Sequence, residues 1–70
     1  MKVLLQDAET FRFLRADDVW TPNADEARDF HQVVRAVDYA LGHGMGDVRV
    51  VIKFRDSRYD LRLPPVPLVA

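Results

Sequence analysis

Residues 23–41 contain the feature that most restricts the fold, because apolar side chains recur there at the spacing of an amphipathic helix. Asn23 and Glu26 have the spacing of a capping box, and Gly42 suits the left-handed position that ends a helix. Two alternatives stay open: one continuous helix, or a short helix ending near Phe30 and a longer one after it. The apolar positions are Ala27, Phe30, Val33, Val34, Val37, Ala40 and Leu41.

The segments on both sides of this helix have the pattern of short β-strands. They are rich in β-branched and aromatic residues, alternate in polarity, and are separated by polar or glycine-containing turns. The first two segments flank a four-residue polar turn and predict a hairpin. Strands are predicted at residues 2–6, 11–15, 19–20, 48–54 and 59–63.

This order of elements predicts an α+β domain over residues 1–64. We expect an antiparallel sheet, ββ(β)αββ along the chain, with one principal helix packed on one face. Residues 65–70 are expected to form a proline-rich C-terminal tail, since proline cannot continue a central strand.

A set of residues spread along the chain carries a resemblance to known sequences. These residues are Trp20-Thr21, Glu26-Ala27, Phe30, Ala36, Tyr39-Ala40 and Val50–Phe54. In this pattern the chain resembles small uncharacterised bacterial proteins, in which the helix likewise follows a hairpin ending in Trp-Thr. The resemblance extends over residues 1–64 and implies the same strand–strand–helix–strand–strand order. It implies a bacterial source and no assigned activity.

The composition predicts a small domain that gains stability from association. A chain of 70 residues buries only about 60% of its unfolded surface. The chain has no cysteine, so disulfides cannot compensate, and self-association is the common remaining means of stabilisation. Acidic residues interrupt the first apolar run, and no stretch reaches the ~20 apolar residues of a membrane span. We therefore expect a cytoplasmic protein with no membrane contact.

Alternation along the predicted strands divides their side chains between two faces of the sheet. The face under the helix is expected to carry Val3, Leu5, Phe11, Phe13, Val48, Val50, Ile52, Phe54, Leu61 and Leu63. The other face is expected to meet water or a partner, because one helix covers only one face. Its possible partner-binding residues are Leu4, Arg12, Leu14, Arg49, Val51, Lys53 and Arg62, alongside Lys2, Gln6 and Asp60.

No combination of residues has the form of a catalytic, cofactor or metal site. Ser57 is the only serine and has no histidine near it in sequence, while a nucleophile needs an adjacent base. His31 and His43 lie about 120° apart around a helix, unlike a metal pair. The aspartates at 17–18 are typical of a turn, and the glycines at 42–46 follow a helix, whereas a phosphate loop precedes one. We expect no enzyme, no cofactor and no metal.

These observations favour a non-enzymatic protein-interaction module that self-associates, most simply as a homodimer; another protein partner is possible. The alternative is a nucleic-acid-binding accessory protein that uses the basic sheet face, although the net charge is only −1. The predicted placement of the aromatic residues under the helix argues against that alternative, because stacking on bases needs exposed rings. A third and weaker option is an enzyme whose site forms only in an oligomer.

Overall fold

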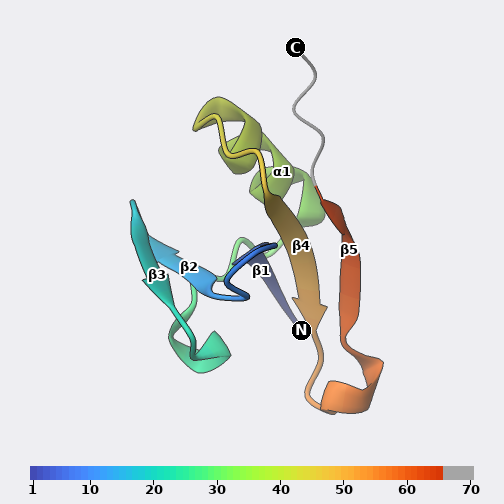
Figure 1. The fold of residues 1–70 in the computed structure, drawn as a ribbon. Coiled ribbons are helices and arrows are strands. Elements are labelled where there is room, and N and C mark those ends of the chain that lie inside the picture. Colours follow the sequence, from blue (N-terminus) through green and yellow to red (C-terminus); the bar gives the residue numbers. More distant parts are fainter. Residues whose placement is uncertain (66–70) are drawn as a thin grey trace.

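A computed structural model describes residues 1–65 and contains one five-stranded antiparallel sheet and one α-helix (Figure 1). The strands lie in the order β3-β2-β1-β4-β5. The predicted α+β class, with one principal helix packed on the sheet, is confirmed. The elements are β1 (Lys2–Asp7), β2 (Phe13–Ala16), β3 (Val19–Thr21), the 3-10 helix η1 (Ala24–Glu26), α1 (Val33–Gly42), β4 (Val48–Lys53), the 3-10 helix η2 (Ser57–Tyr59) and β5 (Leu61–Pro65).

Pro65 belongs to the edge strand β5, where a residue without an N–H is tolerated. The remainder of the predicted proline-rich tail, residues 66–70, lies outside the described residues.

The stretch predicted as helical is divided into η1 and α1 by an extended segment at residues 27–32. The stretch is therefore broken, but the first piece is a 3-10 turn that ends at Glu26 and not a helix that ends near Phe30. Asn23 caps it by accepting a hydrogen bond from the backbone N of Asp25 at 2.9 Å. Glu26 does not complete a capping box, since its carboxylate instead accepts from the Thr21 hydroxyl at 3.3 Å.

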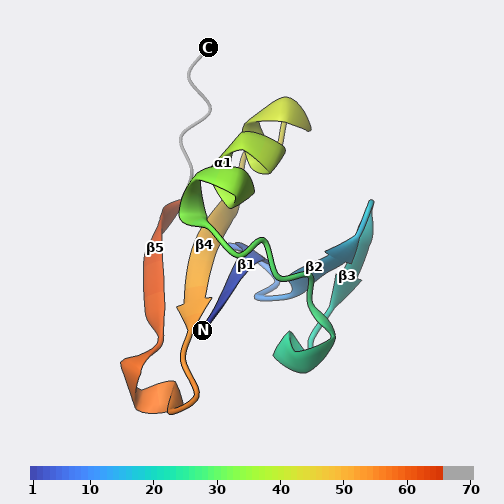
Figure 2. The ribbon, with the colours of Figure 1, turned by 180° about the vertical axis from the view of Figure 1, so that it is seen from behind.

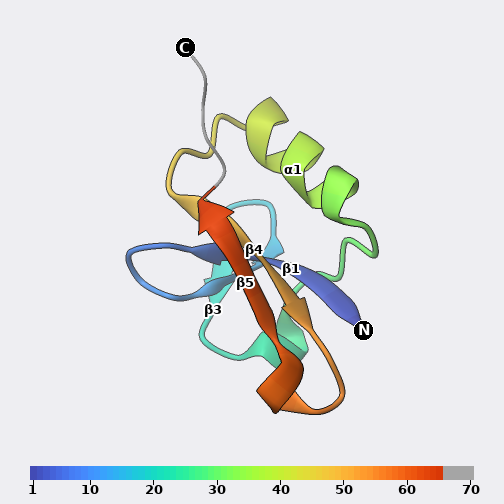
Figure 3. The ribbon, with the colours of Figure 1, turned by 90° about the vertical axis from the view of Figure 1, so that its right-hand side faces the viewer.

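The segment 27–32 passes between β1 and β2, which share one paired position and then diverge. The backbone N of Arg28 donates to the carbonyl of Leu14 on β2 at 2.9 Å, and the N of Phe30 donates to the carbonyl of Val3 on β1 at 2.8 Å. Figure 2 shows this segment running between the two strands. It takes the chain from one side of the sheet to the other, so that η1 and α1 lie on opposite sides (Figure 3).

Asp29 holds this crossing in place with its carboxylate. Its Oδ1 accepts from the backbone N of Val3 at 2.9 Å and from the N of His31 at 2.8 Å. Burial raises the pKa of Asp29, but these two hydrogen bonds and nearby positive charge outweigh it and lower the pKa from 3.8. The bonds turn the chain at His31, which adopts a left-handed φ of 68°.

The main core lies between α1 and the sheet. Ala36 and Ala40 are fully buried on the inner face of α1, and their small side chains let the helix lie close to β1 and β4. Phe30 enters the same core from the crossing segment. The buried residues of this cluster are Val3, Leu5, Leu14, Phe30, Ala36, Ala40, Val48 and Val50.

The predicted assignment of faces is correct for Val3 and Leu5 of β1 and for Val48, Val50 and Ile52 of β4, but wrong for β2. Phe54, also predicted under the helix, lies outside the core cluster. Phe13 pairs with Gln6 and so faces away from α1, whereas Leu14 lies in the core under the helix. The prediction counts alternation from Phe11, but Phe11 takes a left-handed φ of 62° in the turn before β2, so the alternation begins only at Phe13. Phe11 is consequently 62% exposed instead of buried.

The sequence predicts that the face opposite α1 is open to water or a partner. In the structure this face is partly buried. Leu4 and Val51 lie on it and are 0% and 3% exposed. The chain that leaves β3 and forms η1 lies on this side of the sheet and covers part of it (Figure 3). Leu61, the first residue of β5, is 51% exposed because α1 does not reach it. Its predicted core position is therefore wrong.

Candidate functional site

The seven residues of the predicted partner-binding face do not form one surface. Leu4, Leu14 and Val51 are all buried within the single chain, at 0%, 0% and 3% exposure. The prediction that they offer aliphatic contact to a partner is wrong, because the folded chain itself covers them. Arg12 lies outside the sheet, in the exposed β1–β2 turn.

The basic residues of that face do stay together. The β1–β4 and β4–β5 registers place Lys2, Arg49, Lys53 and Arg62 on the η1 side of the sheet. Lys2 and Arg62 are exposed, and Arg49 and Lys53 are half-buried. We call these four residues the basic strip. In a chain of net charge −1 they concentrate positive charge on one side.

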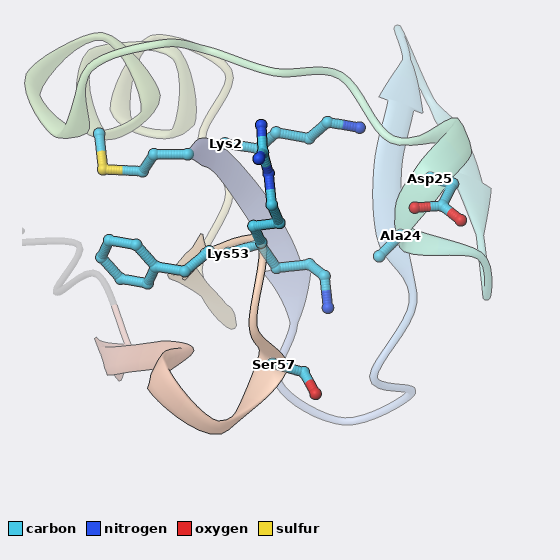
Figure 4. Close-up of a pocket in the computed structure, with 8 residues that line it drawn as sticks. Lys2, Ala24, Asp25, Lys53 and Ser57 are labelled. Carbon is cyan, nitrogen blue, oxygen red and sulfur yellow. The ribbon is translucent and has the colours of Figure 1, made fainter.

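At one end of the basic strip is a pocket of about 460 Å³ (Figure 4). In the view of Figure 4, Lys2 and Lys53 extend from β1 and β4 toward the side where η1 carries Ala24 and Asp25. The pocket therefore lies between the sheet and η1, and it exists because the helical stretch breaks and places η1 on this side. Its lining residues are Met1, Lys2, Ala24, Asp25, Lys53, Phe54, Arg55 and Ser57.

The cations of this pocket differ in how they are neutralised. Lys53 Nζ lies 3.0 Å from Asp60 Oδ2, and Asp60 also accepts from the backbone N of Phe54 at 3.0 Å. The hydrogen bond from the Phe54 backbone N is the main cause that lowers the pKa of Asp60, and the hydrogen bond from Lys53 is the second. The Asp60 carboxylate therefore stays charged and holds Lys53. Lys2 and Arg55 have no ion-pair partner within residues 1–65. These two residues are the available positive charges.

The connection between β4 and β5, which carries Arg55 and Ser57, is ordered locally. Asp56 Oδ1 accepts from the backbone N of Arg58 at 3.0 Å and caps η2. The Arg58 guanidinium, bonded to the same carboxylate at 2.6 Å, lowers the pKa of Asp56. Asp56 therefore remains an anionic cap at ordinary pH. The capped turn places the neighbouring residues Arg55 and Ser57 at the pocket.

A second surface is the outer face of α1. Val34 and Leu41 are 59% and 44% exposed, and being seven residues apart they lie about 20° apart around the helix. Exposed Asp38 and Arg35 lie about 40° and 100° around the helix from Val34, both on the same side, and neither forms an ion pair within the described chain. We call these four residues the α1 stripe. Exposed aliphatic side chains at this spacing are typical of a helix that contacts another helix.

The predicted turn and helix-end residues have structural roles. Tyr39 of α1 donates from its hydroxyl to Asp17 at 2.5 Å, which ties the β2–β3 turn to the helix. This hydrogen bond is the main reason that the pKa of Tyr39 is raised. His43 stacks on the Tyr39 ring at 3.9 Å, and the Arg28 guanidinium lies 5.0 Å from the ring centroid. His31 lies elsewhere, 3.5 Å from Asp29.

The described residues contain no group of three or more His, Cys, Asp or Glu side chains that could hold a metal ion. No helix of residues 1–65 is long and apolar enough to cross a membrane. No family model, curated protein or solved structure matches the chain.

The sequence placed Lys2 and Lys53 on the correct side but missed Asp25 and Arg55. Asp25 lies in the stretch 23–41, which is predicted to form a helix over the opposite face, and Arg55 lies in the turn between the predicted strands 48–54 and 59–63. The one signal that could have located Asp25 is the run of residues 31–34, where His31 and the β-branched pair Val33-Val34 are weak helix formers and indicate a break after η1. Nothing local to Arg55 marks it as a pocket residue.

Proposed function

We propose that this chain is a non-enzymatic interaction module that self-associates as a homodimer through the α1 stripe. The observation that carries the proposal is the exposure of Val34 and Leu41 on the outside of the only α-helix among residues 1–65. The small size of the domain and its lack of cysteine support association as a source of stability. The absence of cysteine also accords with a cytoplasmic, reducing location.

The α1 stripe is complementary to itself under two-fold symmetry. If two α1 helices pack antiparallel about an axis near their midpoint, Val34 lies opposite Leu41 of the partner subunit. The same arrangement brings Arg35 toward Asp38 of the partner subunit, so opposite charges pair along one edge of the contact. A helix of ten residues is about 15 Å long, so the buried area falls below the ~1,200 Å² of a standard interface. We therefore expect a weak dimer that dissociates in the micromolar range.

The non-enzymatic part of the proposal rests on the surroundings of Ser57. This residue lines the pocket, but neither His31 nor His43 is among the lining residues. A serine nucleophile needs a base within hydrogen-bond reach.

Light scattering after size-exclusion chromatography, over a range of protein concentrations, tests the dimer. Wild type should move from monomer to dimer mass, and Val34→Lys should shift that transition to about tenfold higher concentration or beyond. Val34 is exposed and lysine is a good helix former, so the variant should keep its circular dichroism spectrum.

Val19→Lys is the matched control, because Val19 is 46% exposed on the edge strand β3 and the chemical change is identical. It should dimerise like wild type. A wild-type monomer at every concentration would refute the homodimer. Loss of the dimer in Val19→Lys but not in Val34→Lys would move the interface to the β3 edge.

A further inference from the structure

The pocket at the end of the basic strip has the size of a small-molecule site, and its lining is of mixed polarity. Its volume of about 460 Å³ lies within the ~300–1,000 Å³ usual for such sites. Three separate parts of the chain form it: the start of β1, η1, and the segment from the end of β4 into η2. A ligand there would contact parts of the chain that are distant in sequence, and binding would stabilise their arrangement.

One wall of the pocket is suited to an anion. Lys53 is held by Asp60, which leaves Lys2 and Arg55 as cations without an ion-pair partner in the described chain. A guanidinium offers several donors in a fixed planar arrangement, and an ammonium offers a compact point charge. That pair of groups is well matched to a phosphate, which has three acceptor oxygens and up to two negative charges.

The remaining walls indicate more than free phosphate. Met1 and Phe54 are the large apolar residues of the lining, and Phe54 is half-buried. Across from the lysines, the Asp25 carboxylate makes no ion pair within residues 1–65 and is a hydrogen-bond acceptor. A ligand that satisfies all three walls has a phosphate, an apolar or aromatic part, and hydroxyl or amino donors.

We propose that this pocket binds an organic phosphate ester, with the phosphate on Lys2 and Arg55, the apolar part against Phe54 and a donor group on Asp25. A nucleoside monophosphate has all three features. The same chemistry occurs in free nucleotides and in single-stranded nucleic acid, whose further phosphates would follow the basic strip toward Arg62 and Arg49. The proposal is independent of the α1 stripe, which lies on the other side of the sheet.

Calorimetric titration of the full chain at low salt, with four probes, tests the site: adenosine monophosphate, adenosine, inorganic phosphate and a short single-stranded RNA. Adenosine monophosphate should bind with a dissociation constant of roughly 10 µM to 1 mM, and both adenosine and phosphate should bind at least about tenfold more weakly. Arg55→Gln and Lys2→Gln should each weaken nucleotide binding by roughly five- to tenfold. Arg12→Gln, which removes an exposed arginine outside the pocket, is the matched control and should bind like wild type.

The probes also distinguish the two sources of phosphate. RNA that binds much more tightly than the mononucleotide, with a steep salt dependence and sensitivity to Arg62→Gln, would assign the site to nucleic acid. If RNA binds no more tightly per nucleotide than adenosine monophosphate does, and if Arg62→Gln has no effect, the site would be assigned to free nucleotides. Binding of adenosine as tightly as its monophosphate, no loss on Arg55→Gln, or no heat with any probe would overturn the proposal.

Discussion

At the residue scale, Phe11 of the β1–β2 turn combines a left-handed backbone conformation with an exposed ring. Its φ of 62° is unfavourable for a side chain with a Cβ, and its ring is 62% exposed. Phe11→Gly should therefore stabilise the protein by about 1 kcal/mol in chemical denaturation. Phe11→Ala removes the ring but keeps the Cβ, so it should change stability by less than about 0.5 kcal/mol. A destabilised Phe11→Gly variant would mean that the exposed ring contributes contacts that outweigh the strain.

A second residue, Asp29, should make stability depend on pH. Burial raises its pKa, but hydrogen bonds from Val3 and His31 lower it below 3.8 in the folded state. A carboxylate with a lowered folded pKa stabilises the fold above its unfolded pKa, and this stabilisation is lost as the pH falls through the folded pKa. Asp29→Asn keeps an acceptor but cannot titrate. The stability difference between wild type and Asp29→Asn should thus be present at pH 7 and disappear in acid; a difference that stays constant with pH would contradict this.

At the element scale, the sequence predicted what depends on neighbours along the chain. Asn23 marks the start of a helical turn, because capping is a local preference, but Gly42 is the last residue of α1 and the left-handed glycine after it is Gly44, with a φ of 65°. The crossing of residues 27–32 could not be predicted in the same way. It depends on backbone hydrogen bonds from Arg28 and Phe30 to two separate strands, which no local pattern encodes.

Phe30 should be the most important side chain of that crossing, since it is 5% exposed and packs with Tyr39 at a centroid distance of 5.2 Å. Phe30→Ala should cost about 3–5 kcal/mol in chemical denaturation, a large part of the stability of a small domain. Val34→Ala, measured in the monomer, is the control on exposed α1 surface and should cost less than about 1 kcal/mol. A loss below about 1 kcal/mol for Phe30→Ala would show that the crossing segment is not anchored in the core.

At the scale of the whole molecule, the candidate site was only partly readable from the sequence. Two-residue alternation placed Lys2 and Lys53 on one face, and the β1–β4 register pairs them directly. Asp25 and Arg55 join them only through tertiary placement of η1 and of the turn before η2. The aliphatic residues expected beside them are buried: Leu4 and Val51 on the η1 side of the sheet, and Leu14 in the core under α1. The basic strip and the α1 stripe therefore lie on opposite sides of one sheet.

That arrangement predicts two separable effects on thermal stability. The melting temperature of wild type should rise with protein concentration, because mass action favours the folded dimer, whereas that of Val34→Lys should not. Adenosine monophosphate should raise the melting temperature of wild type and of Val34→Lys by similar amounts, since the pocket is formed within one chain. The melting temperature of Arg55→Gln should rise with protein concentration, as in wild type, but should no longer rise with adenosine monophosphate. A Val34→Lys protein that loses its response to nucleotide would show that the pocket requires the dimer.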